Sequence, residues 1–282
     1  MTPPRKRIFV TGGASGIGRA TVERFHREGW HVAAADRNSA ALDDLATELD
    51  REIATFAVDV TDRVSLGDAL QTFTGGGALE VMFNNAGIGH AGWFEDIDPT
   101  AHDRLIQINL TGVLNGIYAS LPHLRQAENP LCFSTSSSSA IFGIARIAVY
   151  AATKFAVKGL TEALSVEFAR PGVQKVRVAD VLPGLIDTPI LDTTEHHPAP
   201  DEELERVDPR ANAPAAGPFR LVQPSEVADS VWDAYQDETG RLHWYVPAEL
   251  EMMEKARAGD LEAIRDSWVE QLGAEGSLPE AP

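Results

Sequence analysis

Tyr150 and Lys154 stand four residues apart, in the run YAATK. On a helix this spacing places both side chains on one face, about one turn apart. A phenol titrates near pKa ~10 and an ammonium near pKa ~10.4, so an ammonium beside a phenolic oxygen favours the phenolate and lowers the tyrosine's pKa. Such a tyrosine exchanges protons at neutral pH. The same five residues also suit an ordinary helix with a solvated lysine, so the rest of the chain must decide.

A glycine-rich loop lies near the start of the chain. The apolar run 7–11 has the composition of a short strand, and residues 19–28 have helical spacing that stops at Gly29. Between them lies GGASGIG, residues 12–18. Glycines let the backbone approach a pyrophosphate, whose charge is met by free N–H groups and the positive end of the helix dipole. Strand, loop and helix together predict a dinucleotide-binding site.

Asp36 follows the second expected strand, 31–35, and stands 18 residues after Gly18. A carboxylate at this place accepts hydrogen bonds from the adenosine ribose hydroxyls and repels a 2′-phosphate. The position therefore favours NAD over NADP. The neighbouring Arg37 keeps NADP open, because arginine pairs well with phosphate.

Polar or small residues follow the later strands as well. Asp59 ends the expected strand 53–58, and the sequences NNAG (84–87), SSSS (136–139) and PG (183–184) end strands 79–83, 131–135 and 175–182. Helices are expected between them, at 40–49, from a cap at Asp62, at 100–124 with interruptions at Gly112 and Gly116, at 149–169, and at 225–235 with Ser225 as cap. A last edge strand is expected at 242–246. This alternation predicts an α/β fold with a doubly wound parallel sheet.

The totals narrow the class of protein. The chain has 282 residues, 44% hydrophobic and 23% charged, and a net charge of −18, which disfavours nucleic acid and anionic membranes. Cys132 is the single cysteine, so no intrachain disulfide forms, and no run suits a signal peptide or a membrane span. We expect a cytoplasmic protein.

The C-terminal third is less regular. Residues 189–222 are rich in proline and acids, and we interpret them as a substrate lid. The adjacent His196 and His197 face different ways, and no spaced ligand completes a metal site, so no metal is expected. We assign 1–248 to one catalytic domain and 249–282 to a C-terminal extension, helical over 249–272 with a break at Gly259 and a loose tail after Gly273.

Taken together, TGGASGIG (11–18), NNAG (84–87), Asn109, the serine run, YAATK (150–154) and PG (183–184) resemble the short-chain dehydrogenase/reductase family, over roughly residues 7–188. The resemblance implies a Rossmann-type fold of seven parallel strands, a nicotinamide cofactor and a catalytic set of Asn, Ser, Tyr and Lys. The family's serine usually stands thirteen residues before the tyrosine, which selects Ser137, with Ser138 as the alternative.

The resemblance also implies roles. Tyr150 exchanges the substrate's proton, Lys154 lowers the tyrosine's pKa and holds the nicotinamide ribose, Ser137 binds the substrate oxygen, and Asn109 fixes a water that connects Lys154 to solvent. The positions expected to bind the cofactor are Gly12, Ser15, Gly16, Ile17, Gly18, Asp36, Arg37, Asp59, Val60, Asn85, Ala86, Gly87, Tyr150, Lys154, Pro183, Gly184, Ile186 and Thr188.

The expected substrate is a small molecule, a hydrophobic secondary alcohol or ketone, because the candidate surroundings are largely apolar. These are His90, Trp93, Ile144, Arg146 and Leu185, of which Arg146 is either a partner for a carboxylate or a surface residue. The resemblance and the long apolar helices from residues 100 and 149 also imply a homo-tetramer or homo-dimer.

Three other functions remain to be weighed. Enoyl reductase relatives separate the tyrosine and lysine by six residues rather than three, and sugar-nucleotide epimerases carry TGxxGxxG where this chain has TGxxxGxG. A regulator or sensor that binds NAD without turnover would be expected to have a damaged catalytic set, whereas all four residues are present.

Overall fold

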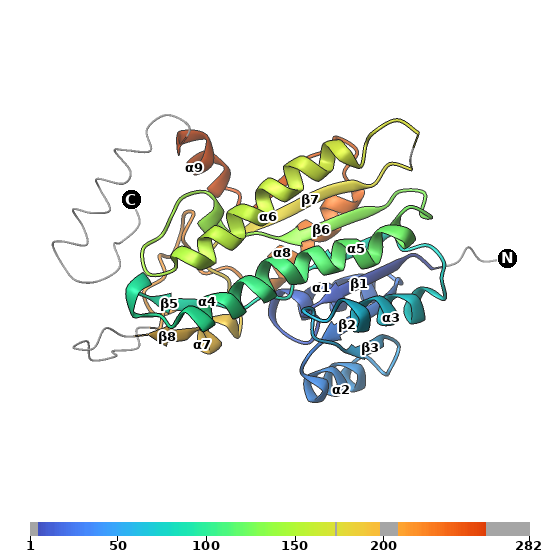
Figure 1. The fold of residues 1–282 in the computed structure, drawn as a ribbon, viewed down its shortest axis with the longest axis horizontal. Coiled ribbons are helices and arrows are strands. Elements are labelled where there is room, and N and C mark those ends of the chain that lie inside the picture. Colours follow the sequence, from blue (N-terminus) through green and yellow to red (C-terminus); the bar gives the residue numbers. More distant parts are fainter. Residues whose placement is uncertain (1–4, 173, 198–207, 258–282) are drawn as a thin grey trace.

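The computed structural model describes residues 5–172, 174–197 and 208–257. Its centre is a seven-stranded sheet in the order β3-β2-β1-β4-β6-β7-β9, with every neighbouring pair parallel (Figure 1). The strands are β1 (Arg7–Thr11), β2 (His31–Asp36), β3 (Ala54–Ala57), β4 (Val81–Asn84), β6 (Leu131–Thr135), β7 (Arg177–Pro183) and β9 (His243–Val246). The expected doubly wound α/β fold is confirmed.

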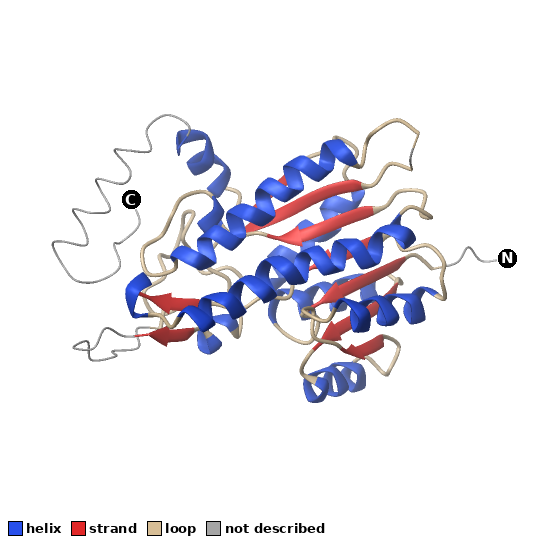
Figure 2. Cartoon of the chain, in the orientation of Figure 1, coloured by secondary structure: helices blue, strands red, loops and turns tan. Residues whose placement is uncertain are grey.

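Helices cover both faces of this sheet, with strands enclosed between them (Figure 2). One apolar core joins the sheet to α1 (Gly16–Arg27), α2 (Ser39–Glu48) and α8 (Pro224–Gln236). The other joins it to α3 (Arg63–Thr74), α5 (Gly112–Leu124) and α6 (Ala148–Glu167). Strands buried on both faces explain the nearly continuous apolar runs in the sequence.

Helix caps were predicted with mixed success. Asp62 caps α3, and its carboxylate accepts hydrogen bonds from the Val64 and Ser65 amides. The prediction of Ser225 as the cap of α8 is wrong. Gln223 is the cap, in a reciprocal capping box with Glu226, and proline occupies the first turn.

The long helix expected over 100–124 is continuous, and the irregularity in it is a π-helical turn that ends directly before Gly112. It consists of α4 (Pro99–Ile106), a π-helical turn (Gln107–Thr111) that contains Asn109, and α5. Gly116 lies inside α5, where a Cβ atom would collide with the Asn84 side chain. The glycine therefore serves close packing of the helix on β4.

A second, two-stranded sheet was not predicted. It pairs β5 (His90–Gly92) with β8 (Glu195–His197), just after α7 (Ile190–Thr193). Short 3₁₀ turns occupy Phe94–Asp96 and Ser138–Ala140. Part of the segment interpreted as a lid is thus folded against the loop that follows β4.

The C-terminal extension begins as α9 (Leu250–Arg257), whose Leu250 is buried beside Ile141 and Leu182. The rest of the predicted helix 249–272, its break at Gly259 and the tail lie outside the described residues, as do positions 198–207 of the lid segment. No helix among the described residues has the length and apolar character needed to cross a membrane.

Candidate active site

The carboxyl ends of the parallel strands meet at one edge of the sheet, and the order of the strands reverses between β1 and β4. Open α/β sheets bind ligands at such a switch point. The glycine loop after β1, Asp36 at the end of β2, Asn85 after β4 and the serines after β6 all stand at this edge.

The glycine loop has the close approach that a pyrophosphate requires. Gly12 and Gly16 have φ of +63° and +51°, a region that favours glycine. A Cβ on Gly12 would lie 2.9 Å from the Ala86 Cα, and one on Gly18 would collide with the Gly12 carbonyl oxygen. The bare backbone here, at the N-terminus of α1, fits a bound dinucleotide phosphate.

Asn85 holds this loop in place rather than projecting away from it. Its side-chain amide donates to the carbonyl oxygens of Thr11 (3.1 Å) and Gly12 (3.3 Å). The Thr11 hydroxyl in turn accepts hydrogen bonds from the backbone N–H groups of Asn85 and Ala86. Thr11 was not among the predicted site residues, although it opens the motif TGGASGIG, because the motif does not show that its hydroxyl joins the loop to the segment after β4.

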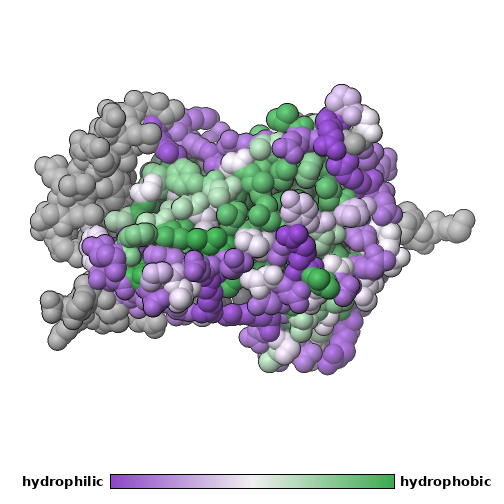
Figure 3. Space-filling model, in the orientation of Figure 1, coloured by the Kyte–Doolittle hydropathy of each residue, from purple (hydrophilic) through white to green (hydrophobic). Residues whose placement is uncertain are grey.

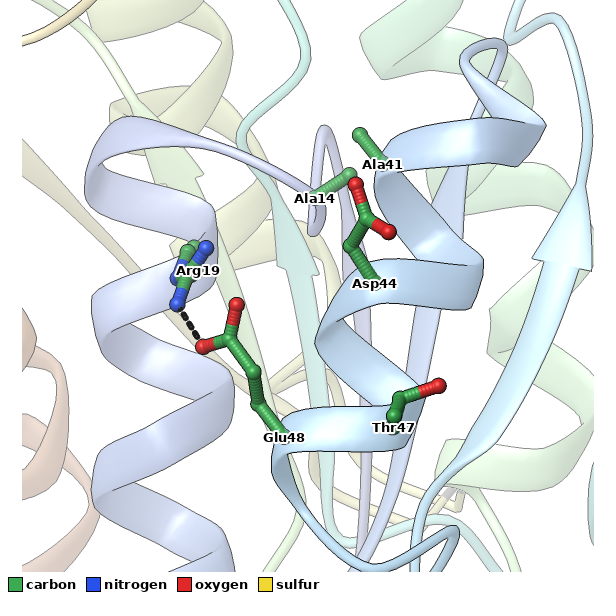
Figure 4. Close-up of a pocket in the computed structure, with 6 residues that line it drawn as sticks. All are labelled: Ala14, Arg19, Ala41, Asp44, Thr47 and Glu48. Atoms are coloured by element: carbon green, nitrogen blue, oxygen red, sulfur yellow. Dashed lines mark hydrogen bonds and ion pairs between the residues drawn. The ribbon is translucent and has the colours of Figure 1, made fainter.

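Asp36 is partly exposed at the end of β2, and its carboxylate accepts hydrogen bonds from the amides of Ala14 (3.3 Å) and Asn38 (3.0 Å). Ala14 also lines a hollow between α1 and α2, where Asp44 and Glu48 add acidic groups (Figure 4). The Arg19 guanidinium in this hollow is paired with Glu48 and Glu23. Acidic side chains therefore outnumber the single arginine in this hollow.

Asp59 and Val60 lie beyond β3, where Val60 is buried and Asp59 is exposed. Hydrogen bonds from the Thr61 amide and hydroxyl lower the pKa of Asp59, and the charge of the exposed Arg37 acts in the same direction. The positive charge of Arg37 therefore acts on Asp59, at the carboxyl edge of the sheet.

Tyr150, Lys154 and Ser137 come together where α6 passes the end of β6. The Lys154 ammonium is 4% exposed, donates to the Thr135 carbonyl oxygen at 2.8 Å and lies 5.6 Å from the centroid of the Tyr150 ring. Ser137 is hydrogen-bonded to the Tyr150 side chain. Its oxygen also accepts from the Ser139 amide at 3.1 Å, which leaves its hydroxyl proton for the tyrosine. The structure brings Ser137 to Tyr150, and the contact does not involve Ser138.

The ionisation of the pair differs from the simple expectation for a tyrosine beside a lysine. Burial raises the pKa of Tyr150, and the hydrogen bond with Ser137 opposes that rise. Burial also lowers the pKa of Lys154 from 10.5 to about 8. Lys154 is not among the causes of the Tyr150 shift in the chain by itself, because its ammonium is directed to Thr135, so the lowering of the tyrosine's pKa by Lys154 stays a prediction.

Asn109 is fully buried, and its amide pairs with the backbone of Ile88 in both directions, at 2.9 and 3.0 Å. A bond to the backbone thus explains the mid-helix asparagine, and its role in fixing a water stays a prediction. A Cβ on Gly87 would lie 3.3 Å from the Asn109 oxygen and 3.7 Å from the Lys154 nitrogen. Asn109, Gly87 and Lys154 therefore converge.

The turn after β7 reaches the glycine loop from the other side. A Cβ on Gly16 would lie 3.0 Å from the Thr188 methyl group, so Thr188 packs directly over that glycine. Ile186 and Thr188 are buried, while Gly184 donates to the Val246 carbonyl oxygen at 2.7 Å. The chain's own fold thus brings the predicted residues Pro183, Gly184, Ile186 and Thr188 to the same edge as the loop.

The predicted substrate residues lie in two groups. The Arg146 guanidinium stacks over Trp93, with 5.3 Å to the ring centroid, and the Arg146 carbonyl accepts from Gly92. His90 is only 2% exposed and packs against His197. Ile144 packs with the apolar cluster under α9, and Leu185 is half-buried. His90 is thus packed into the small sheet rather than open to a ligand.

Among the described residues, no group of three or more histidine, cysteine, aspartate or glutamate side chains is arranged to hold a metal ion.

Thr135 is a further site residue that sequence reasoning missed. Its carbonyl oxygen accepts a hydrogen bond from the Lys154 ammonium, and its hydroxyl donates to the side-chain oxygen of Asn85 at 3.1 Å. Only its place at the end of a strand, next to the serine run, signalled such a role.

Known proteins resemble this chain in sequence and in fold. A family model described as short chain dehydrogenase matches residues 6–199. The chain is 33% identical over 227 residues to levodione reductase of Leifsonia aquatica, covering 78% of this chain and 80% of that protein. It is 35% identical over 188 residues to a 3-alpha-(or 20-beta)-hydroxysteroid dehydrogenase of Mycobacterium tuberculosis, covering 66% and 71%. A 3-ketoacyl-(acyl-carrier-protein) reductase of Brucella melitensis, complexed with NADH, superposes with a TM-score of 0.72 at 26% identity, covering 88% and 99%.

The burial of Lys154 makes stability depend on pH. Between the folded pKa of about 8 and the unfolded value of 10.5, the unfolded chain binds more protons, so this lysine's contribution to stability rises with pH. The fall in pKa corresponds to a penalty of roughly 3 kcal/mol at pH 7. We expect Lys154→Met to be stabilised relative to wild type at pH 7 and to lose that advantage towards pH ~10. Urea unfolding of both proteins at several pH values measures this, and a pH-independent difference would contradict it.

Proposed function

The chain belongs to the short-chain dehydrogenase family, whose members are NAD(P)-dependent oxidoreductases, and we propose that it interconverts a hydrophobic secondary alcohol and its ketone with Tyr150 as the acid and base. The observation that carries the proposal is the contact of Ser137 with Tyr150 beside the buried Lys154. This contact lies at the same sheet edge as the glycine loop.

In the proposed mechanism, a bound nicotinamide supplies the hydride acceptor or donor. During oxidation Tyr150 takes the proton of the substrate hydroxyl, and during reduction it returns that proton. The Ser137 hydroxyl donates to the substrate oxygen and stabilises the negative charge that develops there. Lys154 holds its ammonium between Thr135 and the tyrosine ring, and is assigned to the nicotinamide ribose.

The remaining roles are proposals of the same kind. Asn109 positions the Ile88 backbone and the π-helical turn beside Lys154, and the turn after β7 receives the carboxamide. Trp93, Arg146, Ile144 and Leu185 shape the substrate's surroundings. The name of one relative, the 3-alpha-(or 20-beta)-hydroxysteroid dehydrogenase, supports a hydrophobic alcohol, and that of the levodione reductase supports a reduction.

The proposed role of Tyr150 predicts a selective loss of turnover. Tyr150→Phe removes the titrating hydroxyl, so we expect the rate to fall by roughly 10²- to 10⁴-fold with coenzyme binding retained. Absorbance at 340 nm, with NAD and a panel of secondary alcohols, measures the rate. Tyr118→Phe, at a tyrosine 62% exposed on α5, is the matched control and should keep full activity.

Two results would count against this function. Full activity in the Tyr150→Phe protein would overturn the mechanism. A wild-type chain that binds NAD but turns over no alcohol or ketone in the panel would favour the regulatory or sensor alternative.

We further propose NAD rather than NADP as the coenzyme. A 2′-phosphate would meet the carboxylate of Asp36, and Ala14, which bonds Asp36, also lines the hollow that holds Asp44 and Glu48. The arginine in that hollow is already paired with Glu48 (Figure 4). Like charges brought together cost several kcal/mol, whereas the ribose hydroxyls can donate to the carboxylate.

This preference predicts that kcat/KM with NAD exceeds that with NADP by roughly a hundredfold. Asp36→Ala should narrow the ratio to below about tenfold, because it removes the nearest negative charge. Asp43→Asn, an equal change of charge on the exposed side of α2, serves as control and should leave the ratio unchanged. An equal rate with both coenzymes in the wild type would refute the proposal.

We also propose that the chain forms a homo-dimer or homo-tetramer. A broad apolar band crosses the face that α5 and α6 present (Figure 3). Tyr118 on α5 and Val166 on α6 are 62% and 74% exposed, and Leu110, Leu114 and Leu121 are half-buried. Exposed apolar area of this kind marks association surfaces.

Light scattering after size exclusion is expected to give two or four times the monomer mass. Tyr118→Glu/Val166→Glu should shift the protein towards monomer, since it places charges in the band. Val64→Glu, at a residue 73% exposed on α3, is the control. A wild-type monomer at all concentrations would show the proposal to be wrong.

A further inference from the structure

Arg210 makes an unusual number of contacts for a side chain that is not at the catalytic centre. Its guanidinium donates to Asp187 (2.7 Å), to both carboxylate oxygens of Asp192 (2.9 and 2.8 Å) and to Asp208 (3.4 Å). It also donates to the backbone carbonyl oxygen of Thr188 at 3.2 Å. One cation thus joins three carboxylates and a main-chain oxygen.

The residues it holds belong to the turn that follows β7. Asp187 and Thr188 are consecutive in this turn, and Asp192 lies in α7 immediately after it. Thr188 packs over Gly16, where an added Cβ would lie 3.0 Å from its methyl group. A path of direct contact therefore runs from Arg210 through Thr188 to the glycine loop.

We propose that Arg210 is a positioning residue that fixes the Ile186–Thr188 turn in the conformation that receives the nicotinamide carboxamide. The inference rests on the proposed function, which assigns that turn to the carboxamide. Arg210 acts through Thr188 and Asp187 and is not assigned a contact with coenzyme or substrate.

The geometry requires an arginine in particular. The planar guanidinium grips Asp192 with two parallel hydrogen bonds and still has donors for Asp187 and for the Thr188 carbonyl. A lysine would offer one ammonium and could satisfy only part of this set. Without the cation, Asp187 and Asp192 would repel each other and loosen the turn.

The test compares two ligands that share the adenosine half. ADP-ribose lacks the nicotinamide ring, so it does not need the turn after β7, whereas NADH does. In Arg210→Gln we expect the Kd for NADH to rise roughly tenfold, the effect of one or two lost hydrogen bonds, and the Kd for ADP-ribose to stay within about twofold. Arg210→Lys should lie between wild type and Arg210→Gln. Isothermal calorimetry measures both constants.

The chain offers a matched control and a second variant. Arg24 pairs with Glu28 and Asp229 near the C-terminal end of α1, so Arg24→Gln removes an ion-paired arginine away from the turn, and both affinities should remain at wild-type values. Asp192→Asn keeps Arg210 but weakens the bidentate contact, and should produce a smaller selective loss for NADH. It keeps the proposal testable should Arg210→Gln fail to fold.

An unchanged NADH affinity in Arg210→Gln or, should that variant not fold, in Asp192→Asn would overturn the inference, as would equal losses for both ligands. Those results leave the proposed function standing, because wild type would still bind NADH. A wild-type chain that binds neither NADH nor ADP-ribose would instead overturn the proposed function, and the role of Arg210 with it.

Discussion

A buried ammonium organises the catalytic end of this molecule. An amine in the interior must have partners, because burial penalises its charged form. Lys154 finds its partner in the Thr135 carbonyl, and the Thr135 hydroxyl donates to Asn85, whose amide holds the glycine loop at Thr11 and Gly12. One charge on α6 is thereby linked to the ends of β6, β4 and β1. Hydrogen bonds thus connect Lys154 continuously with the proposed coenzyme loop.

The parallel sheet explains why such distant residues can share a site. Every strand of the seven ends at the same edge, so residues separated by more than a hundred positions in sequence come to lie side by side. The two sides of the site are held differently. Strand ends and buried hydrogen bonds fix the glycine loop. The turn after β7 is fixed by backbone hydrogen bonds to Val222, by Thr188 against Gly16 and by the ion pairs of Arg210. The Arg210 ion pairs lie outside the apolar core. We therefore expect substitutions in them to change the affinity for coenzyme without disturbing the core.

The sequence was sufficient where periodicity and strand-end chemistry are strong. The strands near 7–11, 31–36 and 131–135, the Asp62 cap and the doubly wound sheet were all predicted, as was the family. It was insufficient where tertiary contacts decide. The π-helical turn follows from Asn109 bonding Ile88, and the pairing of His90 with Glu195 joins segments a hundred residues apart. Ser137 and Ser138 are equivalent in a run of four serines, and only the position of Tyr150 distinguishes them.

Direct hydride transfer is the central claim, and an isotope experiment tests it most directly. The enzyme would be incubated with NAD and secondary alcohols that carry deuterium on the carbinol carbon, and the reduced coenzyme examined by proton NMR. The account predicts deuterium on one face of the nicotinamide C4, in amounts equal to the ketone formed, because a fixed site presents one ring face to the substrate. Reduced coenzyme that carries no deuterium, or deuterium distributed over both faces, would contradict the account.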